Sequence, residues 1–197
     1  ISKAKEDINY EYLKTRITEM IERSLIGSER MKKIIMDLKA FSRLDAAEYA
    51  ESDIHSALDI TLSILTHEYK DRIVVKKEYG ELPLIECYIA RINQVFMNLL
   101  VNAGHAIKGK GEVTIRTGVE NEMVKIEISD TGGGIPEGII DKIFDPFFTT
   151  KPVGSGTGLG LSISHGIIEK HKGTISVKSK LGEGTTFTVM IPVHQTE

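Results

Sequence analysis

The sequence has too little cysteine, too little excess charge and too few long apolar runs for several classes of protein. Its single cysteine, Cys87, excludes an internal disulfide and a metal site made of cysteines alone. Lysine and arginine total 25, aspartate and glutamate total 28, and the net charge of −3 argues against a dedicated nucleic-acid-binding protein. No run approaches the roughly 18 consecutive apolar residues of a membrane span, and no signal-peptide pattern opens the chain.

What is present suffices for a buried core. Of the 197 residues, 41% are hydrophobic, which excludes a fully disordered chain. The length fits one large domain or one domain with a small appendage. Because the first residue is Ile1 rather than methionine, we expect the chain to be a piece of a longer protein.

The N-terminal region has the pattern of an amphipathic helix. Its apolar residues recur mostly at steps of three and four: Ile17, Ile21, Leu25, Met31, Ile34, Ile35, Leu38 and Phe41. This spacing predicts one apolar stripe, close to a coiled-coil seam. A single helix cannot bury such a stripe, so we expect a partner helix from another subunit or from the missing N-terminal part. Dimerisation is the favoured interpretation, and one helix of a globular bundle is the alternative.

The remainder alternates between helix and strand patterns. We expect helices over Ile54 to His67 (capped by Ser52 or Asp53), Ile92 to Ile107 and Leu161 to His171. We expect strands over Ile73 to Tyr79, Leu84 to Cys87, Val113 to Ile115, Met123 to Ser129, Gly173 to Ser179 and Thr185 to Pro192. Hairpins dominate the second half, which favours an α+β fold: a two-layer α/β sandwich with a mixed sheet and helices on one face.

Two asparagines lie four residues apart in the strongly apolar helix pattern. Asn98 and Asn102 therefore project from one face, one turn apart. Buried amides are costly unless paired, so these two line either a polar core network or a ligand cleft. An amide oxygen is a hard ligand suited to Mg²⁺. His105, on the same side, is either a solvated histidine near the helix end or a phosphate-facing residue.

A carboxylate precedes a glycine-rich turn in the segment from Asp130 to Pro136. Its three consecutive glycines allow positive φ and close approach of a planar ligand, and a buried aspartate can accept a hydrogen bond from an exocyclic amine. An ordinary Asp-Gly turn is the alternative. The Asp-Thr-Gly triplet also matches the aspartic-protease signature, but that chemistry needs two such carboxylates in one site, and the helices argue against it.

A second glycine cluster, Gly154 to Gly160, leads directly into a helix. Its backbone N–H groups and the helix N-terminus form an anion cradle suited to phosphates. It follows no strand at Rossmann spacing, and the chain contains no P-loop. The preceding loop, Phe144 to Lys151, is rich in aromatics and has the character of a lid. Lys151 is placed either to reach a phosphate or to lie solvated on the surface.

In their order and spacing, these clusters resemble the catalytic and ATP-binding domain of sensor histidine kinases, which has the Bergerat fold. They look like its N box (Asn98 to Asn102), G1 box (Asp130, Gly132, Gly134), F box (Phe144, Phe147, Phe148), G2 box (Gly156, Gly158, Gly160) and third glycine motif (Gly184, Thr185). Arg30 to Arg43 resembles the second helix of the dimerisation and phosphotransfer domain. The resemblance thus implies a partial dimerisation domain at residues 1–47 and the ATP-binding domain at 48–197.

The resemblance also implies a role for each position that matches a motif. Asp130 would hydrogen-bond the adenine amino group, and Thr185 would support the same ring edge. Asn102 would hold Mg²⁺, and Asn98 would lie beside the metal and the phosphates. Lys151 would neutralise the triphosphate and, with Asn98, would act in catalysis. Other contacts with ATP would come from His105, Ala106, Gly132, Gly134, Ile135, Ile143, Phe148, Gly156, Thr157, Gly158, Leu159 and Gly160.

Asn98 bears on the type of reaction. In the related gyrase, chaperone and mismatch-repair ATPases, the position four before the metal-binding asparagine is usually a glutamate that activates water, and an amide cannot act as a general base. The resemblance therefore favours a kinase that passes the γ-phosphoryl group to a histidine and then to a response-regulator aspartate. An ATPase of the same fold and a non-enzymatic nucleotide-binding scaffold are the alternatives.

The chain departs from the family at the phosphoacceptor. The family's accepting histidine opens the first dimerisation helix, whereas here no histidine precedes His55. We therefore expect that the accepting helix is missing and that the chain cannot phosphorylate itself. The expected partners are Mg-ATP, a second copy through the N-terminal helix and a receiver domain, with no nucleic acid and no membrane segment. This portion is expected to be cytoplasmic, and membrane anchoring through the missing part stays open.

Overall fold

The computed structural model describes residues 12–25, 27–28, 49–151 and 156–194. Several features predicted from the sequence fall wholly or partly elsewhere. The second half of the N-terminal stripe, from Met31 to Phe41, lies outside the described residues, as do the match of Arg30 to Arg43 and the positions Gly154 and Ser155.

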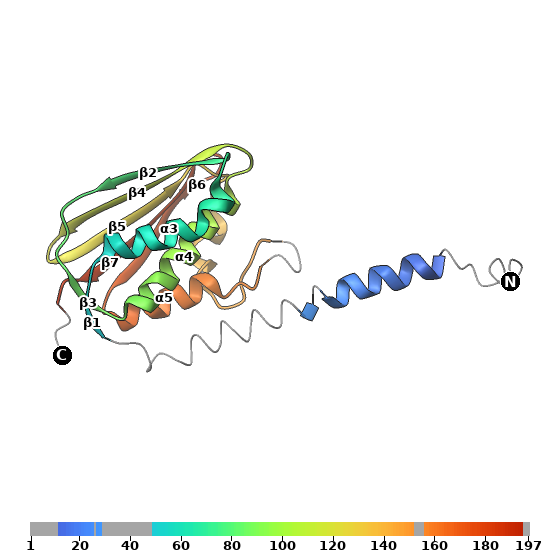
Figure 1. Ribbon diagram of the computed structural model, residues 1–197, viewed down its shortest axis with the longest axis horizontal. Coiled ribbons are helices and arrows are strands. Elements are labelled where there is room, and N and C mark those ends of the chain that lie inside the picture. The colour runs from blue at the N-terminus through green and yellow to red at the C-terminus, as the bar shows by residue number, and fades with distance from the viewer. Residues whose placement is uncertain (1–11, 26, 29–48, 152–155, 195–197) are drawn as a thin grey trace, which may run out of the picture.

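A five-stranded mixed sheet forms one layer of the domain, with the strand order β2-β4-β5-β7-β6 (Figure 1). Only β2 and β4 pair in parallel, and the other neighbours are antiparallel. A separate two-stranded sheet joins β1 and β3. The strands are β1 (Ala50–Ser52), β2 (Ile73–Tyr79), β3 (Ile85–Cys87), β4 (Gly111–Glu120), β5 (Met123–Asp130), β6 (Thr174–Lys180) and β7 (Gly184–Pro192). The mixed sheet predicted from the sequence is confirmed.

Three α-helices cover one face of the five-stranded sheet (Figure 1). They are α3 (Ile54–Tyr69), α4 (Ile89–Ala106) and α5 (Gly160–Lys170), and a short 3₁₀ helix, η2 (Glu137–Lys142), precedes α5. Of the two candidate caps for α3, Asp53 serves: its Oδ1 accepts hydrogen bonds from the backbone N–H groups of His55 (2.8 Å) and Ser56 (3.2 Å). The predicted two-layer α/β sandwich is therefore confirmed.

The period of two along the central strands determines which side chains meet the helices. Along β5, Val124, Ile126 and Ile128 are buried, and Asp130 ends this series on the same face. Along β7, Thr185 begins the buried series, and it is the Cα partner of Asp130. The strand pattern thus brings a carboxylate and a hydroxyl side by side at one end of the core.

The structure extends or adds elements where the sequence pattern is weak. Helix α4 begins at Ile89 rather than Ile92, and β4 begins at Gly111 rather than Val113. Strand β4 pairs with β2 as far as Thr117 and continues to Glu120 through its pairing with β5, although its second half lacks an apolar alternation. Strand β1 depends on pairing with β3. The 3₁₀ helix η2 lies between the expected strand that ends at Ser129 and the expected helix that begins at Leu161, directly before the buried Ile143.

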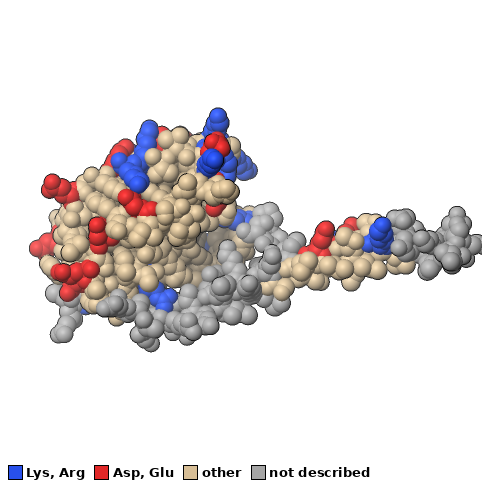
Figure 2. Space-filling model, viewed as in Figure 1, with Lys and Arg blue, Asp and Glu red and all other residues tan. Residues whose placement is uncertain are grey.

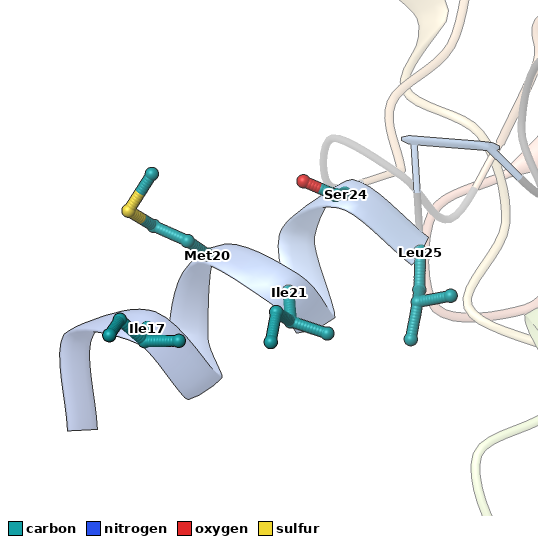
Figure 3. A pocket seen from close by; sticks show the side chains of 5 residues that line it. All are labelled: Ile17, Met20, Ile21, Ser24 and Leu25. Atoms are coloured by element: carbon teal, nitrogen blue, oxygen red, sulfur yellow. The ribbon is translucent and has the colours of Figure 1, made fainter. Parts of the chain in front are cut away.

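The N-terminal segment 12–25 is helical, as its periodicity predicts. Ile17, Ile21 and Leu25 lie in a row along it, and they are 55%, 55% and 60% exposed in this single chain (Figure 3). Dimerisation through this stripe stays a prediction. On the face of the molecule drawn in Figure 2, acidic and basic side chains both occur. Over the parts of the chain that the structure describes, no helix combines the length and apolarity needed to cross a membrane.

Candidate functional site

Asp130 stands at the end of β5 with its side chain on the helix-covered face of the sheet. It is 8% exposed. Its Oδ1 accepts a hydrogen bond from the backbone N–H of Gly132 at 2.7 Å, and the backbone N–H of Thr185 also donates to the carboxylate. Burial raises the pKa of Asp130, and the two backbone hydrogen bonds only partly oppose this. The site therefore contains a fixed acceptor in a largely dry setting, which suits an exocyclic amine.

A hydroxyl pair joins the third glycine motif to the turn after Asp130. The Oγ atoms of Ser179 and Thr185 lie 2.9 Å apart. Ser179 also accepts from the N–H of Ile135 at 2.7 Å and donates to the carbonyl of Gly184 at 2.9 Å. The sequence analysis did not identify Ser179. A signal for it does exist in the sequence. Along β6, Ile175 and Val177 face inward, and Ser179 is the next inward position but is polar.

The glycines after Asp130 are required by the packing of the chain itself. A Cβ on Gly132 would lie 2.6 Å from the Cβ of Ala106, and a Cβ on Gly134 would lie 2.1 Å from the carbonyl oxygen of Lys180. Gly134 also has a φ of 70°. The N–H of Gly133 donates to the carbonyl of Ala106 at 3.1 Å. The packing of the chain itself therefore already requires glycine at Gly132 and Gly134, and their contact with a ligand stays a prediction.

Helix α4 presents Asn102 and His105 to the loop that carries Lys151. The Nζ of Lys151 lies 3.5 Å from the Oδ1 of Asn102 and 2.9 Å from the Nδ1 of His105. The Nε2 of His105 lies 3.6 Å from the Oε1 of Glu68 on α3. The structure thus brings three predicted site residues together and adds Glu68, which no sequence motif marked.

Asn98 faces a different neighbour from Asn102. Its Nδ2 donates to the carbonyl of Gly160 at 2.9 Å and to the Oγ of Ser164 at 3.1 Å. Both acceptors lie in the first two turns of α5. Asn98 therefore ties α4 to the start of α5, and the two asparagines, although one turn apart, make separate contacts.

The G2 segment meets the F box loop before α5 begins. Gly158, with a φ of 68°, accepts from the N–H of Phe147 at 2.9 Å, and its Cβ, if present, would lie 2.4 Å from the carbonyl carbon of Phe147. The Thr157 hydroxyl accepts from the N–H of Leu159 at 3.4 Å. No side chain caps the N-terminus of α5, which follows at Gly160. A helix N-terminus without a side-chain cap retains N–H groups suited to an anion.

The remaining predicted contact residues are distributed between core and loop. Ile143 is buried, and Ile135 and Phe148 are partly buried against the core. Ala106 lies in the last turn of α4 against Gly132. Gly156 approaches the F box loop, since a Cβ there would lie 2.8 Å from the Oγ1 of Thr149.

The site offers a cation few protein ligands. Among the described residues, no group of three or more His, Cys, Asp or Glu side chains is arranged to hold a metal ion. Mg²⁺ commonly takes one or two protein ligands and completes its shell with water and substrate phosphates. The amide oxygen of Asn102, beside Lys151, has the chemistry for such a ligand, and the acceptor at Asp130 has the chemistry to receive the amino group of an adenine base.

Comparison with known proteins agrees with this geometry. A family model described as "Histidine kinase-, DNA gyrase B-, and HSP90-like ATPase" matches residues 88–195. Sensor kinase CckA of Brucella abortus is 35% identical over 182 residues, which cover 84% of this chain and 19% of that protein. Signal transduction histidine-protein kinase AtoS of Escherichia coli is 35% identical over 192 residues, which cover 96% of this chain and 30% of that protein. The chain therefore spans less than a third of the length of these two relatives.

Solved structures give the same result. Histidine kinase ShkA in complex with AMPPNP has a TM-score of 0.72 at 25% identity, with 83% of this chain and 36% of that chain covered. A nucleotide-free catalytic domain of histidine kinase ThkA has a TM-score of 0.68 at 32% identity, with 75% of this chain and 97% of that chain covered. The chain thus belongs to the family of histidine kinase-, DNA gyrase B- and HSP90-like ATPases, as an ATP-binding catalytic part of a histidine kinase.

Proposed function

We propose that this chain binds Mg-ATP between two groups of residues and transfers the γ-phosphoryl group to a histidine outside the chain. The adenine end of the site comprises Asp130, Gly132 to Gly134 and Thr185. The phosphate end comprises Asn102, His105, Lys151 and Gly156 to Gly160. The observation that carries the proposal is that the Nζ of Lys151 lies 3.5 Å from the amide oxygen of Asn102, a ligand type suited to Mg²⁺.

At the adenine end, Asp130 accepts a hydrogen bond from the amino group of the base. Its two backbone hydrogen bonds hold the carboxylate in place, so little side-chain entropy is lost on binding. Thr185 is fixed by Ser179 and supports the same edge of the ring. Ala106, Ile135, Ile143 and Phe148 supply the apolar walls.

At the phosphate end, the amide oxygen of Asn102 would hold Mg²⁺. The metal neutralises phosphate charge when bound. Lys151 donates to the triphosphate, and the N–H groups of Gly156 to Gly160 face the phosphates at the start of α5. Phosphoryl transfer demands mainly charge neutralisation and in-line positioning, which these residues provide.

The identity of residue 98 favours transfer over hydrolysis. An amide cannot remove a proton from water, and the NH₂ group of Asn98 already donates to Gly160 and Ser164. Bound ATP therefore awaits an external nucleophile. An imidazole nitrogen of the acceptor histidine attacks the γ-phosphorus, the bond to the β–γ bridging oxygen breaks, and ADP leaves. The phosphoryl group then passes to a response-regulator aspartate in the cytoplasm.

One comparison and one feature of the N-terminal helix support the proposed partners. ThkA in complex with the response regulator TrrA resembles this chain with a TM-score of 0.69 at 26% identity, with 84% of this chain and 49% of that chain covered. The exposed row of Ile17, Ile21 and Leu25 provides an apolar face on which a second copy of the N-terminal helix can pack.

Calorimetry with Mg-ATP and an acceptor assay test the proposal. The chain should bind Mg-ATP, and Asp130→Asn should weaken binding about 10- to 100-fold. The carboxylate has two accepting oxygens for the N–H groups of Gly132 and Thr185 and the amino group of the base, whereas the amide has one and would turn an NH₂ donor toward one of these donors. Asp141→Asn, on the exposed surface of η2, is the control. The chain alone should form no phosphohistidine, whereas an added dimerisation helix pair carrying a histidine should acquire acid-labile phosphate. Absence of binding would refute the proposal, and rapid steady-state hydrolysis without acceptor would favour the ATPase alternative.

A further inference from the structure

We propose that Glu68 is a positioning residue of the phosphate end: it orients His105, and His105 in turn holds Lys151 beside Asn102. Glu68 lies in the last turn of α3, outside every motif that the sequence displays. The effect of Glu68 on triphosphate binding rests on the proposed function. The arrangement of Glu68, His105 and Lys151 is independent of it.

The three side chains form a continuous chain of contacts. Glu68 Oε1 lies 3.6 Å from His105 Nε2, and Lys151 Nζ lies 2.9 Å from His105 Nδ1. Each ring nitrogen of the histidine thus has its own neighbour, a carboxylate on one side and an ammonium on the other. His105 stands between α3 and the loop that carries Lys151.

The packing of the two helix ends makes this contact possible. Gly104 lies next to His105, and a Cβ there would lie 2.9 Å from the ring of Tyr69 and 3.7 Å from the carboxylate of Glu68. The hydroxyl of Tyr69 donates to the carbonyl of Leu100 at 2.6 Å, which fixes the last turn of α3 against α4. The position of Glu68 therefore follows from buried neighbours, although Glu68 itself is partly exposed.

The hydrogen bond from Lys151 defines the state of the histidine ring. An ammonium group has only protons to donate, so Nδ1 must be the acceptor and carry no proton. In the neutral ring the proton is then on Nε2, which faces Glu68. A carboxylate at that nitrogen favours this tautomer and this ring orientation, as second-neighbour carboxylates do for other functional histidines. Without Glu68, only Lys151 would favour this tautomer, and the share of the other tautomer, whose Nδ1–H would point at Lys151 and repel it, should rise.

Loss of Glu68 should therefore weaken triphosphate binding without affecting the base. The side chains of His105 and Glu68 are 48% and 37% exposed, so the contribution is that of a solvent-screened pair. We expect Glu68→Ala to lower the affinity for a Mg-bound, non-hydrolysable ATP analogue about two- to fivefold. The affinity for adenosine, which has no phosphates, should not change.

Nuclear magnetic resonance of the ¹⁵N-labelled chain tests the arrangement directly. Long-range ¹H–¹⁵N spectra should show His105 protonated on Nε2 in the wild type, a mixture of tautomers in Glu68→Ala, and the wild-type pattern in Glu68→Gln, whose amide oxygen still accepts. Glu169→Ala is the matched control, because it removes another histidine–glutamate pair, with His165 on α5, at 3.4 Å. Unchanged His105 signals in Glu68→Ala would overturn the proposal.

A double-mutant cycle tests whether Glu68 acts through His105. His105→Ala should weaken binding of the ATP analogue, and adding Glu68→Ala to it should cause no further loss. If Glu68→Ala weakened binding as much in the His105→Ala variant as in the wild type, Glu68 would act independently of His105, and the proposal would be overturned. If the wild type binds no nucleotide, the proposed function fails, and the tautomer of His105 still decides the role of Glu68.

Discussion

The adenine end of the site is held by backbone atoms of the sheet, whereas the phosphate end is held by loops and long side chains. At the adenine end, Gly134 presses against the backbone of Lys180, and Gly184, with a φ of 115°, would place a Cβ 1.9 Å from the carbonyl oxygen of Asp130. At the phosphate end, Phe147 contacts Gly158 from loop to loop, and Lys151 reaches His105 through a flexible side chain.

This difference indicates which end can adapt to a ligand. Atoms fixed by β-strand pairing cannot move without disturbing the core, so the base-binding end is preorganised. Loop and side-chain contacts open at a lower free-energy cost than strand contacts. Under the proposed function, we therefore expect a triphosphate to reorganise the phosphate end on binding, while the adenine end would recognise the base without rearrangement.

The largest expected loss of stability comes from adding a methyl group at Gly134, at the adenine end. Gly134→Ala combines a φ of 70° with a Cβ 2.1 Å from a backbone carbonyl, so we expect the free energy of unfolding to fall by about 3 kcal/mol. Gly133→Ala is the matched control, because a Cβ there meets nothing within 4 Å. Urea denaturation measures both. Equal stability of the two variants would show that the adenine end is not rigid.

An equivalent change at the phosphate end should have a smaller effect on global stability. Gly158→Ala has a similar φ of 68° and a Cβ 2.4 Å from the backbone of Phe147. Because the strain can be relieved within two loops, we expect the free energy of unfolding to fall by less than about 1 kcal/mol. The affinity for Mg-ATP should nevertheless fall about tenfold, as the loop can no longer present its N–H groups.

Gly138→Ala provides the reference for Gly158→Ala, since it adds a methyl group in η2 where nothing lies within 4 Å. It should match the wild type in both urea denaturation and calorimetry. If Gly158→Ala destabilised the chain as strongly as Gly134→Ala, the proposed contrast between the two ends of the site would be wrong.

The smallest expected effect is on the pH dependence of stability and concerns His171, which follows the last turn of α5 and anchors this end of the helix. His171 is 2% exposed; its Nδ1 donates to the carbonyl of Ile167 at 2.8 Å, and its Nε2 accepts from the N–H of Tyr88 at 3.1 Å. Burial lowers the pKa of His171, so the folded state holds the neutral ring. Below a pH of about 6.5 the unfolded chain binds the extra proton, and stability falls as the pH falls.

Urea denaturation across this pH range isolates the contribution of His171. The loss should not exceed about 1.4 kcal/mol per pH unit for one proton, and His171→Asn should make the dependence shallower. His165→Asn, on the exposed side of the same helix, should retain the wild-type dependence. Identical slopes in the wild type and in His171→Asn would exclude His171 as the titrating anchor.

Much of the site could be predicted because its residue types break a pattern. Asn98 and Asn102 interrupt an apolar helix face, and Asp130 ends an alternating strand, so each is visible without coordinates. Ser179 and Glu68 escaped prediction for the opposite reason. A serine on a half-buried strand and a glutamate at the end of an amphipathic helix are ordinary in sequence, and only their neighbours give them a role.

The sequence by itself determined the types of the long helices and strands, the order of the motifs and the chemistry available, because periodicity, glycine placement and side-chain identity are local properties. Tertiary structure alone decided which neighbours these groups meet. It placed Asn98 against α5 and Asn102 beside Lys151. It also placed Gly132 against Ala106 and Gly134 against Lys180, so closely that neither position has room for a side chain. The physical reason is that such contacts join elements far apart in the chain, whose separation depends on the packing of the whole core.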